Sequence, residues 1–509
     1  MPSSGPAVRA GRVVANVLYN YGGLLVSTAI GFGLTPVLIR HLGHQTFGVY
    51  VLISSMIGYT SLLDLGIGVS VMKLVADHVD DEDRSELAVL VSSGVALYMG
   101  LGAAVLLAGA ALYPFLGSAF GVHGAQLHSF RTAYVIAAVS AALTFPSAIY
   151  TGLNQGFHDF RATNTIGALQ SAASACGYLS AVEIGAGLVG IVSAGSLVNF
   201  IAYFAKVVYT KRAHGVGFSA SLVRRKALRR IASFSWPLIV GNLAVTVIFD
   251  VDNVVVGAVL GAATVTSFAV TGGATSAMES LGDAMNAVVL PTASTLRSRN
   301  DQNGLQRLLL ESVRISALVL GPFVVLAATW GRQLFKLWVG ANFEPSAPTL
   351  SVMALGVTVA MVQGAATQFV IAAGKQRWML LVSVPEAIAN LALSVLLARH
   401  MGIVGVAWGT TIPTFFTTFL VVIPYACRLT EASVLAAYRR LALPFAVQSC
   451  AYLALKYVLG VRSFSSLLTL GAASLIVLIT CYALCLALEP RERATYIALA
   501  RRRLARKVA

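Results

Sequence analysis

Long apolar runs separated by short polar turns set the pattern of this chain. In residues 38–66, LIRHLGHQTFGVYVLISSMIGYTSLLDLG, one apolar run ends at Arg40, a polar turn contains Gly43 and Gln45, and a second run begins at Phe47. An α-helix rises 1.5 Å per residue, so such runs, each of roughly 20 residues or more, can cross a hydrocarbon core of about 30 Å. A membrane β-barrel would need alternating segments of about ten residues, which this sequence lacks. The pattern predicts an all-α membrane protein made of transmembrane hairpins.

We predict fourteen transmembrane spans, and this even number places both termini on one side of the membrane. The spans are 13–39, 47–72, 87–117, 130–153, 163–183, 187–209, 232–258, 263–293, 311–331, 350–373, 378–398, 402–427, 441–460 and 464–488.

Composition agrees with this pattern. Hydrophobic residues make up 57% and charged residues 11% of the 509 residues, and the mean hydropathy is +0.80, which excludes a soluble domain. The net charge of +16 comes from short loops between the spans, so it reflects membrane orientation and not nucleic-acid binding. The five cysteines lie within or at the ends of apolar runs and lack metal-ligand spacing, so we expect no metal site.

Lysine and arginine favour the cytoplasmic side of a membrane, which orients the chain. The loops opposite the termini hold only Arg40, Arg332, Lys336, Arg399 and Arg462. We therefore expect both termini in the cytoplasm and the turn at Gln45 outside. The cations on the terminal side are Arg9, Arg12, Lys73, Arg84, Arg161, the run from Lys206 to Arg230, Arg297, Arg299, Arg307, Lys375, Arg377, Arg428, Arg439, Arg440 and the tail from Arg491 to Lys507.

The most basic loop divides the chain. We predict an N-lobe at 1–210 with spans one to six, a linker at 211–231, a C-lobe at 232–428 with spans seven to twelve, spans thirteen and fourteen at 429–489, and a basic cytoplasmic tail at 490–509. The linker either sets topology or forms an amphipathic helix from Ser221 onward. In the second case Leu222, Val223, Ala227, Leu228 and Ile231 would enter the inner leaflet.

The two lobes carry short sequence echoes. The segment GLVGIV at Gly187 recurs as GIVGVA at Gly402, and the turn Leu42-Gly43 recurs as Leu260-Gly261. Their shared order and roughly six-span separation indicate two parallel repeats of six helices.

These motifs identify a resemblance. Several segments resemble those of Wzx-type polysaccharide flippases. They are PVLIRHLGHQTFG at 36–48, LLDLGIG at 62–68, the loop 152–161, Asp252-Asn253 and the two Gly-hydrophobic-Val-Gly segments. These flippases belong to the multidrug/oligosaccharidyl-lipid/polysaccharide exporter superfamily. The resemblance implies two six-helix lobes in a V-shaped arrangement around a central cavity, with two extra C-terminal helices. It implies translocation of an undecaprenyl-diphosphate-linked oligosaccharide from the inner to the outer leaflet of a bacterial cytoplasmic membrane.

The expected function is therefore transport for surface polysaccharide synthesis, with O-antigen, capsule and exopolysaccharide all open, and without a catalytic residue. The expected partners are the lipid-linked oligosaccharide, membrane lipids and the polymerase machinery. A proton or Na⁺ gradient is the expected driver, since no GxxxxGK[ST] motif is present. A multidrug efflux transporter, a lipid II flippase and a sugar-lipid ligase or polymerase are the alternatives.

Charged residues inside spans are the candidate site residues, because they would be costly against lipid. The acids could bind a coupling ion or could simply hold helices together by hydrogen bonds. They are Asp64, Asp250, Asp252, Glu279, Asp283 and Glu386. The cations could bind a diphosphate, although Arg314 has a plain alternative in a pair with Glu311. They are Arg40, Arg131 and Arg314.

Overall fold

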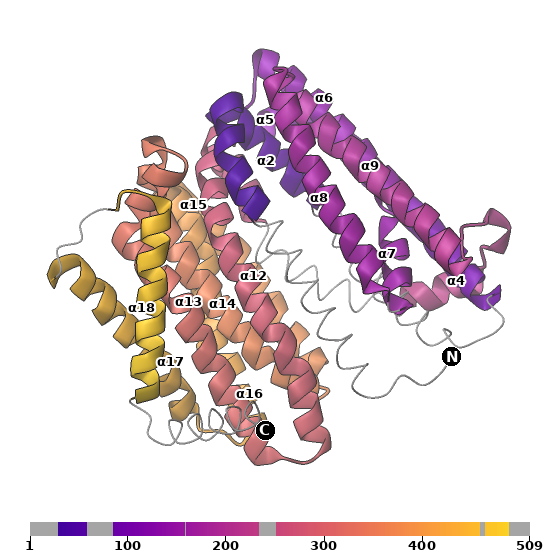
Figure 1. The fold of residues 1–509 in the computed structure, drawn as a ribbon. Coiled ribbons are helices and arrows are strands. Elements are labelled where there is room, and N and C mark those ends of the chain that lie inside the picture. The colour runs from indigo at the N-terminus through magenta and orange to yellow at the C-terminus, as the bar shows by residue number, and fades with distance from the viewer. Residues whose placement is uncertain (1–28, 59–84, 158, 234–250, 459–463, 488–509) are drawn as a thin grey trace, which may run out of the picture. The chain divides into compact units, whose positions relative to one another are not determined.

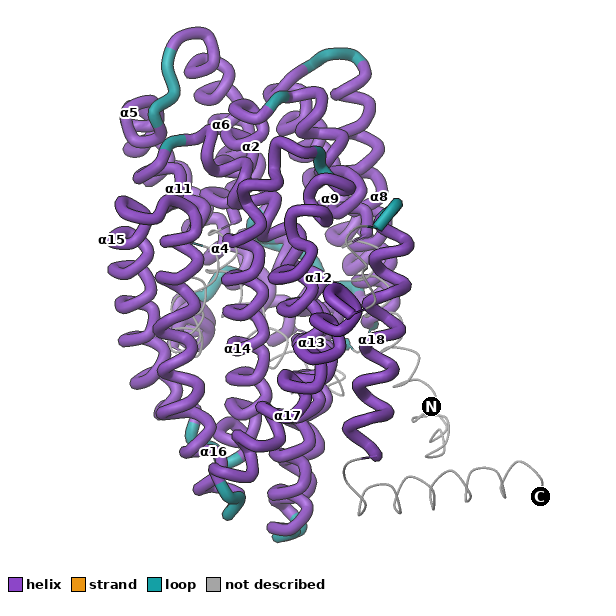
Figure 2. Tube along the Cα trace, turned by 90° about the vertical axis from the view of Figure 1, so that its left-hand side faces the viewer, coloured by secondary structure: helices purple, strands orange, loops and turns teal. Residues whose placement is uncertain are grey.

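The computed structural model describes residues 29–58, 85–157, 159–233, 251–458 and 464–487. Within these ranges the chain forms helices joined by short turns and has no strand (Figure 2). Helices cover every predicted span that falls in the described ranges, which confirms the all-α membrane fold. Six helical stretches of the described chain are long and apolar enough to cross a membrane: Ser85–Phe120, Gly124–Gly156, Gly187–His214, Gln302–Trp338, Ala341–Ala372 and Arg377–Thr430.

The chain forms two compact units. The first contains Met1–Gly273 and Ser383–Val406, and the second contains Ala274–Val382 and Ala407–Ala509. The divisions fall inside two long helices, α12 (Ala262–Ser298) and α15 (Gln376–Phe416). The lobe boundary expected at 211–231 stays a prediction.

The first unit is built on helices that pack along their lengths, with α8 beside α9 and α6 beside α9 (Figure 1). Its helices are α2 (His44–Gly58), α4 (Ser85–Leu112), α5 (Leu116–Phe120), α6 (Gly124–Thr144), α7 (Ser147–Gly156), α8 (Phe160–Glu183), α9 (Gly187–His214) and α11 (Asp252–Leu260). Pro146 separates α6 from α7, since proline lacks the backbone N–H that a helix interior requires.

The segment after α9 is part of the core of the first unit. Residues 225–233 are helical, and Ala227 and Ile231 are buried in a cluster with Val91 of α4 and Ile149 of α7. The idea that Ala227 and Ile231 enter the lipid leaflet is therefore wrong. Their four-residue spacing does place them on one apolar face, but that face packs against protein.

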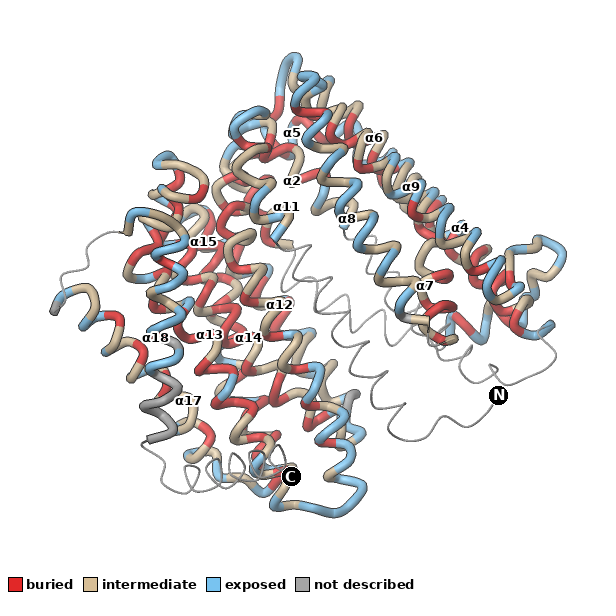
Figure 3. Tube along the Cα trace, in the orientation of Figure 1, coloured by how far each residue is buried: buried red, intermediate tan, exposed pale blue. Residues whose placement is uncertain are grey.

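The second unit has its own core along α13 (Gln302–Trp338) and α14 (Ala347–Ala372), where buried positions are dense (Figure 3). Further helices are α16 (Ile423–Thr430), α17 (Val434–Leu453) and α18 (Leu467–Ala487). Leu309, Phe369 and Ile423 belong to one apolar cluster, and Trp330 packs with Tyr452 in another. Both clusters join helices that are distant in sequence.

The echoing glycines all have positive φ angles. Gly43 and Gly261 have φ of 76° and 89°, and Gly187 and Gly402 have φ of 60° and 59°. This left-handed region suits glycine, which has no Cβ. Gly402 interrupts α15 between the spans predicted at 378–398 and 402–427. Positive φ at the echoing glycines is what a repeated hairpin predicts.

Candidate functional site

A cavity of about 610 Å³ lies within the first unit, among α2, α6, α7, α8 and α9. Hydroxyl and amide side chains contribute much of its wall, and Lys206 is the one charged side chain in the described lining. Such a wall can hydrogen-bond a hydroxyl-rich molecule and attract one anionic group. The polar lining residues are Tyr50, Ser54, Ser140, Thr144, Ser147, Thr151, Gln155, Tyr178, Ser196, Asn199 and Lys206.

Helix α9 presents its polar residues to the cavity because of their spacing. Ser196, Asn199 and Lys206 follow the three- and four-residue steps that keep side chains on one helix face. Other positions of α9, such as Leu197 and Phe204, are exposed apolar residues. Lys206 lies two turns before the helix ends at His214, so it belongs to the helix and not to the loop.

Hydrogen bonds hold the cavity walls together. Gln170 on α8 donates its amide hydrogen to the Asn199 side-chain oxygen on α9 at 2.8 Å. Ser140 on α6 donates to the backbone carbonyl of Ser196 at 3.4 Å. A Cβ at Gly195 would lie 2.7 Å from the Tyr178 hydroxyl, so glycine here lets that ring reach the wall. The positions of the polar groups thus depend on the packing of α6, α8 and α9 as well as on their spacing along each helix.

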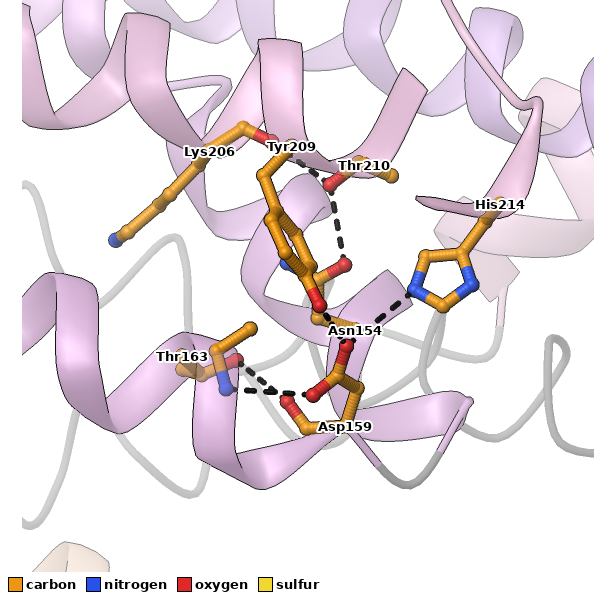
Figure 4. Close-up of polar contacts among 8 residues, drawn as sticks. Asn154, Asp159, Thr163, Lys206, Tyr209, Thr210 and His214 are labelled. Atoms are coloured by element: carbon orange, nitrogen blue, oxygen red, sulfur yellow. Dashed lines mark hydrogen bonds and ion pairs between the residues drawn. The ribbon is translucent and has the colours of Figure 1, made fainter. Parts of the chain in front are cut away.

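A polar cluster ties the last turns of α9 to the turn between α7 and α8 (Figure 4). The Asp159 carboxylate caps α8 by accepting from the Ala162 backbone N–H at 3.3 Å. It also accepts from the Tyr209 hydroxyl at 2.5 Å, and His214 Nε2 lies 3.8 Å from it. The His214 ring stacks on Phe157 with 4.1 Å between ring centroids. One carboxylate therefore joins the start of α8 to the end of α9.

A second contact in this cluster lies directly beside the cavity. The buried Asn154 on α7 accepts a hydrogen bond from the Thr210 hydroxyl at 3.1 Å. The same hydroxyl is 2.8 Å from the backbone carbonyl of Lys206. Figure 4 shows Lys206 on the same stretch of helix as Tyr209 and Thr210. The cluster thus fixes the helical turns that carry the cavity's ammonium group.

The predicted acids do not meet at this cavity's described wall. Asp64 and Asp250 lie outside the described residues. Glu279 and Asp283 lie on α12, in the second unit, four residues apart, and Asp283 is exposed. Their proposed roles stay predictions.

Asp252 and Glu386 are buried in the first unit, with 6% and 4% exposure. Asp252 starts α11 and accepts a hydrogen bond from the Ser394 hydroxyl on α15 at 3.5 Å. That hydroxyl also lies 3.3 Å from the Val406 carbonyl oxygen. Glu386, Asn390 and Ser394 repeat every four residues, so they form a buried polar stripe on one face of α15.

The predicted cations occupy separate places. Arg40 is exposed at the end of its helix. Arg131 donates to the Pro114 carbonyl at 3.3 Å and lies over the Tyr113 ring. Arg314 is buried in the second unit, and its guanidinium is 3.8 Å from the Glu311 carboxylate, which confirms the plain pairing. Arg40 and Arg131 belong to the first unit and Arg314 to the second.

Sequence reasoning missed Lys206 as a cavity residue by grouping it with the loop cations. The signal was present in the chain, because Ser196, Asn199 and Lys206 share one helical face within an otherwise apolar run. The hydroxyl lining was missed for another reason. Serine and threonine are common between membrane helices, so their presence alone does not indicate a cavity.

Comparison with known proteins adds a family and a fold. A family described as "Polysaccharide biosynthesis protein" matches residues 13–297, which is more than half of the chain. A Shigella flexneri protein described as "Putative O-antigen transporter" is 22% identical over 400 residues, covering 78% of this chain and 93% of that protein.

Solved structures share the architecture. The lipid II flippase MurJ in an inward closed conformation aligns with a TM-score of 0.71 at 14% identity, covering 92% of this chain and 99% of that chain. An inward-facing multidrug resistance MATE transporter of the MOP superfamily aligns with a TM-score of 0.64 at 14% identity, covering 82% and 95%. The chain therefore has the fold of this superfamily, as the sequence motifs predicted.

Proposed function

Because the chain belongs to the polysaccharide biosynthesis protein family, we propose that it is a flippase for a lipid-linked oligosaccharide. It would move an undecaprenyl-diphosphate-linked repeat unit from the inner to the outer leaflet of a bacterial cytoplasmic membrane. The observation that carries the proposal is the polar cavity of the first unit, with one ammonium group in its described lining.

The chemistry of such a substrate matches that wall. Sugar hydroxyls lose hydrogen bonds to water when they enter hydrocarbon, so a path across the membrane must supply replacements. Serine, threonine, tyrosine, asparagine and glutamine side chains offer both donors and acceptors. The Lys206 ammonium offers a charge to the diphosphate. The lipid tail can remain in the bilayer while the head group passes.

The cavity size supports binding of a head group and not of the whole lipid. A volume of about 610 Å³ lies within the usual range for pockets that enclose small organic ligands. Alternating access would then open this polar space first toward the cytoplasm and next toward the outside. The substrate itself undergoes no covalent change in this proposal, and the delivered units serve a polysaccharide polymerase.

For the energy source we propose a proton or Na⁺ bound at Asp252. The Ser394 hydroxyl lies within hydrogen-bonding distance of both the Asp252 carboxylate and the Val406 carbonyl oxygen. Oxygen groups of this kind suit a proton or a hard cation. A buried carboxylate is costly when charged, so binding a cation there would stabilise the unit. Asp252→Asn should lower transport while leaving the amount of folded protein unchanged, and full transport by this variant would remove Asp252 from the mechanism.

The direct test is genetic and chemical. Cells that lack the protein should lose surface polysaccharide and accumulate lipid-linked repeat units that face the cytoplasm. Unchanged surface polymer would refute the flippase function. Loss of peptidoglycan synthesis instead would indicate lipid II as the cargo, and increased drug sensitivity alone would indicate drug efflux.

The same cells can test the cavity. Lys206→Gln should restore at most a tenth of the surface polymer, because a neutral amide cannot replace a charge beside the diphosphate. Lys206→Arg should retain partial function. Lys211→Gln is a matched control, since it removes an exposed lysine from the last turn of the same helix. Equal loss in the Lys206 and Lys211 variants would show a general effect of charge and not a cavity role.

A further inference from the structure

The basic segment, residues 224–230, is held firmly on the first unit. The Ser219 backbone N–H donates to the Ser92 hydroxyl of α4 at 3.1 Å. The Arg224 backbone N–H donates to the Ser93 hydroxyl at 3.1 Å. Ser92 and Ser93 are both fully buried. With Ile231 in the core as well, this segment is docked in one position and is not a loose linker.

Docking divides the cations of the segment into two sets. Arg230 pairs with Glu86 of α4 at 3.1 Å, and the Arg224 guanidinium donates to the Ser221 carbonyl at 2.9 Å. Arg225, Lys226 and Arg229 are exposed, and the described part of the chain provides no ion pair for them. Arg224 and Arg230 are thus engaged by groups of the protein, and Arg225, Lys226 and Arg229 keep a compact positive charge.

The level of the segment relative to a membrane follows from α9. Exposed apolar side chains continue along this helix to Val208, and Lys211 and Arg212 follow in its last turn. The helix has 28 residues, which is about 42 Å at 1.5 Å per residue and exceeds a hydrocarbon core of about 30 Å. The change from apolar to basic side chains thus marks where hydrocarbon gives way to head groups.

The basic segment lies close to this level. It follows the end of α9 by about ten residues, and its hydrogen bonds attach it near the start of α4. Phe218, six residues before its start, is 42% exposed, and apolar rings beside basic residues are favourable at a membrane surface.

We propose that Arg225, Lys226 and Arg229 form a preformed site for the phosphate groups of anionic membrane lipids, separate from the cavity. Head-group phosphates are present at the level where these side chains end, and guanidinium groups bind phosphate with paired hydrogen bonds. The docked helix holds the charges together before any lipid arrives. An acidic protein segment is the competing occupant, but the exposed Phe218 six residues upstream favours a lipid surface.

The test uses the full-length purified protein and two lipids, phosphatidylglycerol and phosphatidylcholine. Binding is measured by native mass spectrometry and by the lipid-dependent rise of the unfolding temperature. Each cation near an anionic surface contributes about fivefold to binding, so the triple variant R225Q/K226Q/R229Q should bind phosphatidylglycerol on the order of 100-fold more weakly. Phosphatidylcholine binding should not change.

A matched control removes three other exposed arginines from the side predicted to be cytoplasmic. R297Q/R299Q/R307Q changes the net charge by the same amount but leaves the basic segment intact. It should bind phosphatidylglycerol as the wild type does. Equal weakening in both triple variants would overturn the proposal, because the effect would then be one of overall charge.

A second variant tests whether docking matters. S92A/S93A keeps every cation but removes the two hydroxyls that hold the segment. We expect several-fold weaker phosphatidylglycerol binding, and unchanged binding would show that a preformed arrangement is not needed. Binding of an acidic peptide that depends on Arg225, with no phosphatidylglycerol preference, would also overturn the lipid assignment.

Discussion

The close contact between α4 and α6 gives a quantitative test of how the cavity wall is built. A Cβ added at Gly102 would lie 2.8 Å from the Ala142 carbonyl oxygen and 3.4 Å from the Ala142 carbonyl carbon. Comfortable contacts between such a carbon and an oxygen are about 3.3–3.6 Å. Gly102→Ala would therefore force the two helices apart by roughly 0.5 Å. Because Ala141 lines the cavity, this shift would reach its wall.

The free-energy cost of the clash at Gly102 can be separated from the general stabilising effect of alanine in a helix. Gly100 lies on the same helix, and no atom is within 4 Å of a Cβ placed there. Both substitutions gain about 0.5–1 kcal/mol of helix stability because glycine is flexible. Only Gly102→Ala also carries the overpacking cost of about 1–3 kcal/mol. The difference between the two variants should thus be about 1–3 kcal/mol in favour of Gly100→Ala.

The assay is thermal unfolding of both variants and the wild type in one detergent at one scan rate. Gly100→Ala should unfold at or above the wild-type temperature, and Gly102→Ala should unfold several degrees lower than Gly100→Ala. If the unfolding temperatures of the two variants change equally, the α4–α6 contact does not need a small residue. The close approach inferred at Ala142 would then be incorrect.

Three further results are expected. Tyr209→Phe should lower stability by about 1–2 kcal/mol and speed amide exchange in the first turn of α8, because Asp159 loses its hydroxyl donor. Glu311→Gln should lower the unfolding temperature more than Arg440→Gln does, because Glu311 pairs with both Arg314 and Arg440. The difference in unfolding free energy should be roughly 1–3 kcal/mol. Equal effects of the two substitutions would contradict a carboxylate shared by both arginines. A cysteine at exposed position Gln45 should react with an impermeant thiol reagent in intact cells, and labelling only after lysis would reverse the predicted topology.

Most of the fold could be predicted from the sequence because a membrane helix is indicated by a local feature, its long apolar run. A long apolar run has one stable solution in lipid, since each backbone group must find its partner inside the helix. The glycine echoes worked for a similar reason. Gly43, Gly187, Gly261 and Gly402 occupy left-handed turns, and this requirement is visible wherever glycine recurs at matched places.

The site was harder to predict because a cavity depends on how several helices pack. The sequence analysis selected charged residues inside the spans, and it correctly expected acids such as Asp252 to be buried. It could not show that Tyr50, Thr151 and Asn199 face one space, since each lies on a different helix. The same limit applied to Ala227 and Ile231, whose apolar face could meet lipid or protein equally well. Periodicity reveals a face, but only packing reveals what covers it.

Helix α2 connects the two features on which the proposed transport depends. Asp252 begins α11, and Gly257 on that helix sits so close to Leu52 of α2 that a Cβ there would be 2.5 Å from its methyl group. The next residues of α2, Ile53 and Ser54, line the cavity. A cation bound at Asp252 would change the charge at the start of α11, and a shift of that tightly packed helix would press on the Leu52 side chain of α2. The proposed ion site therefore has a short mechanical route to the cavity wall, through packing inside one compact unit.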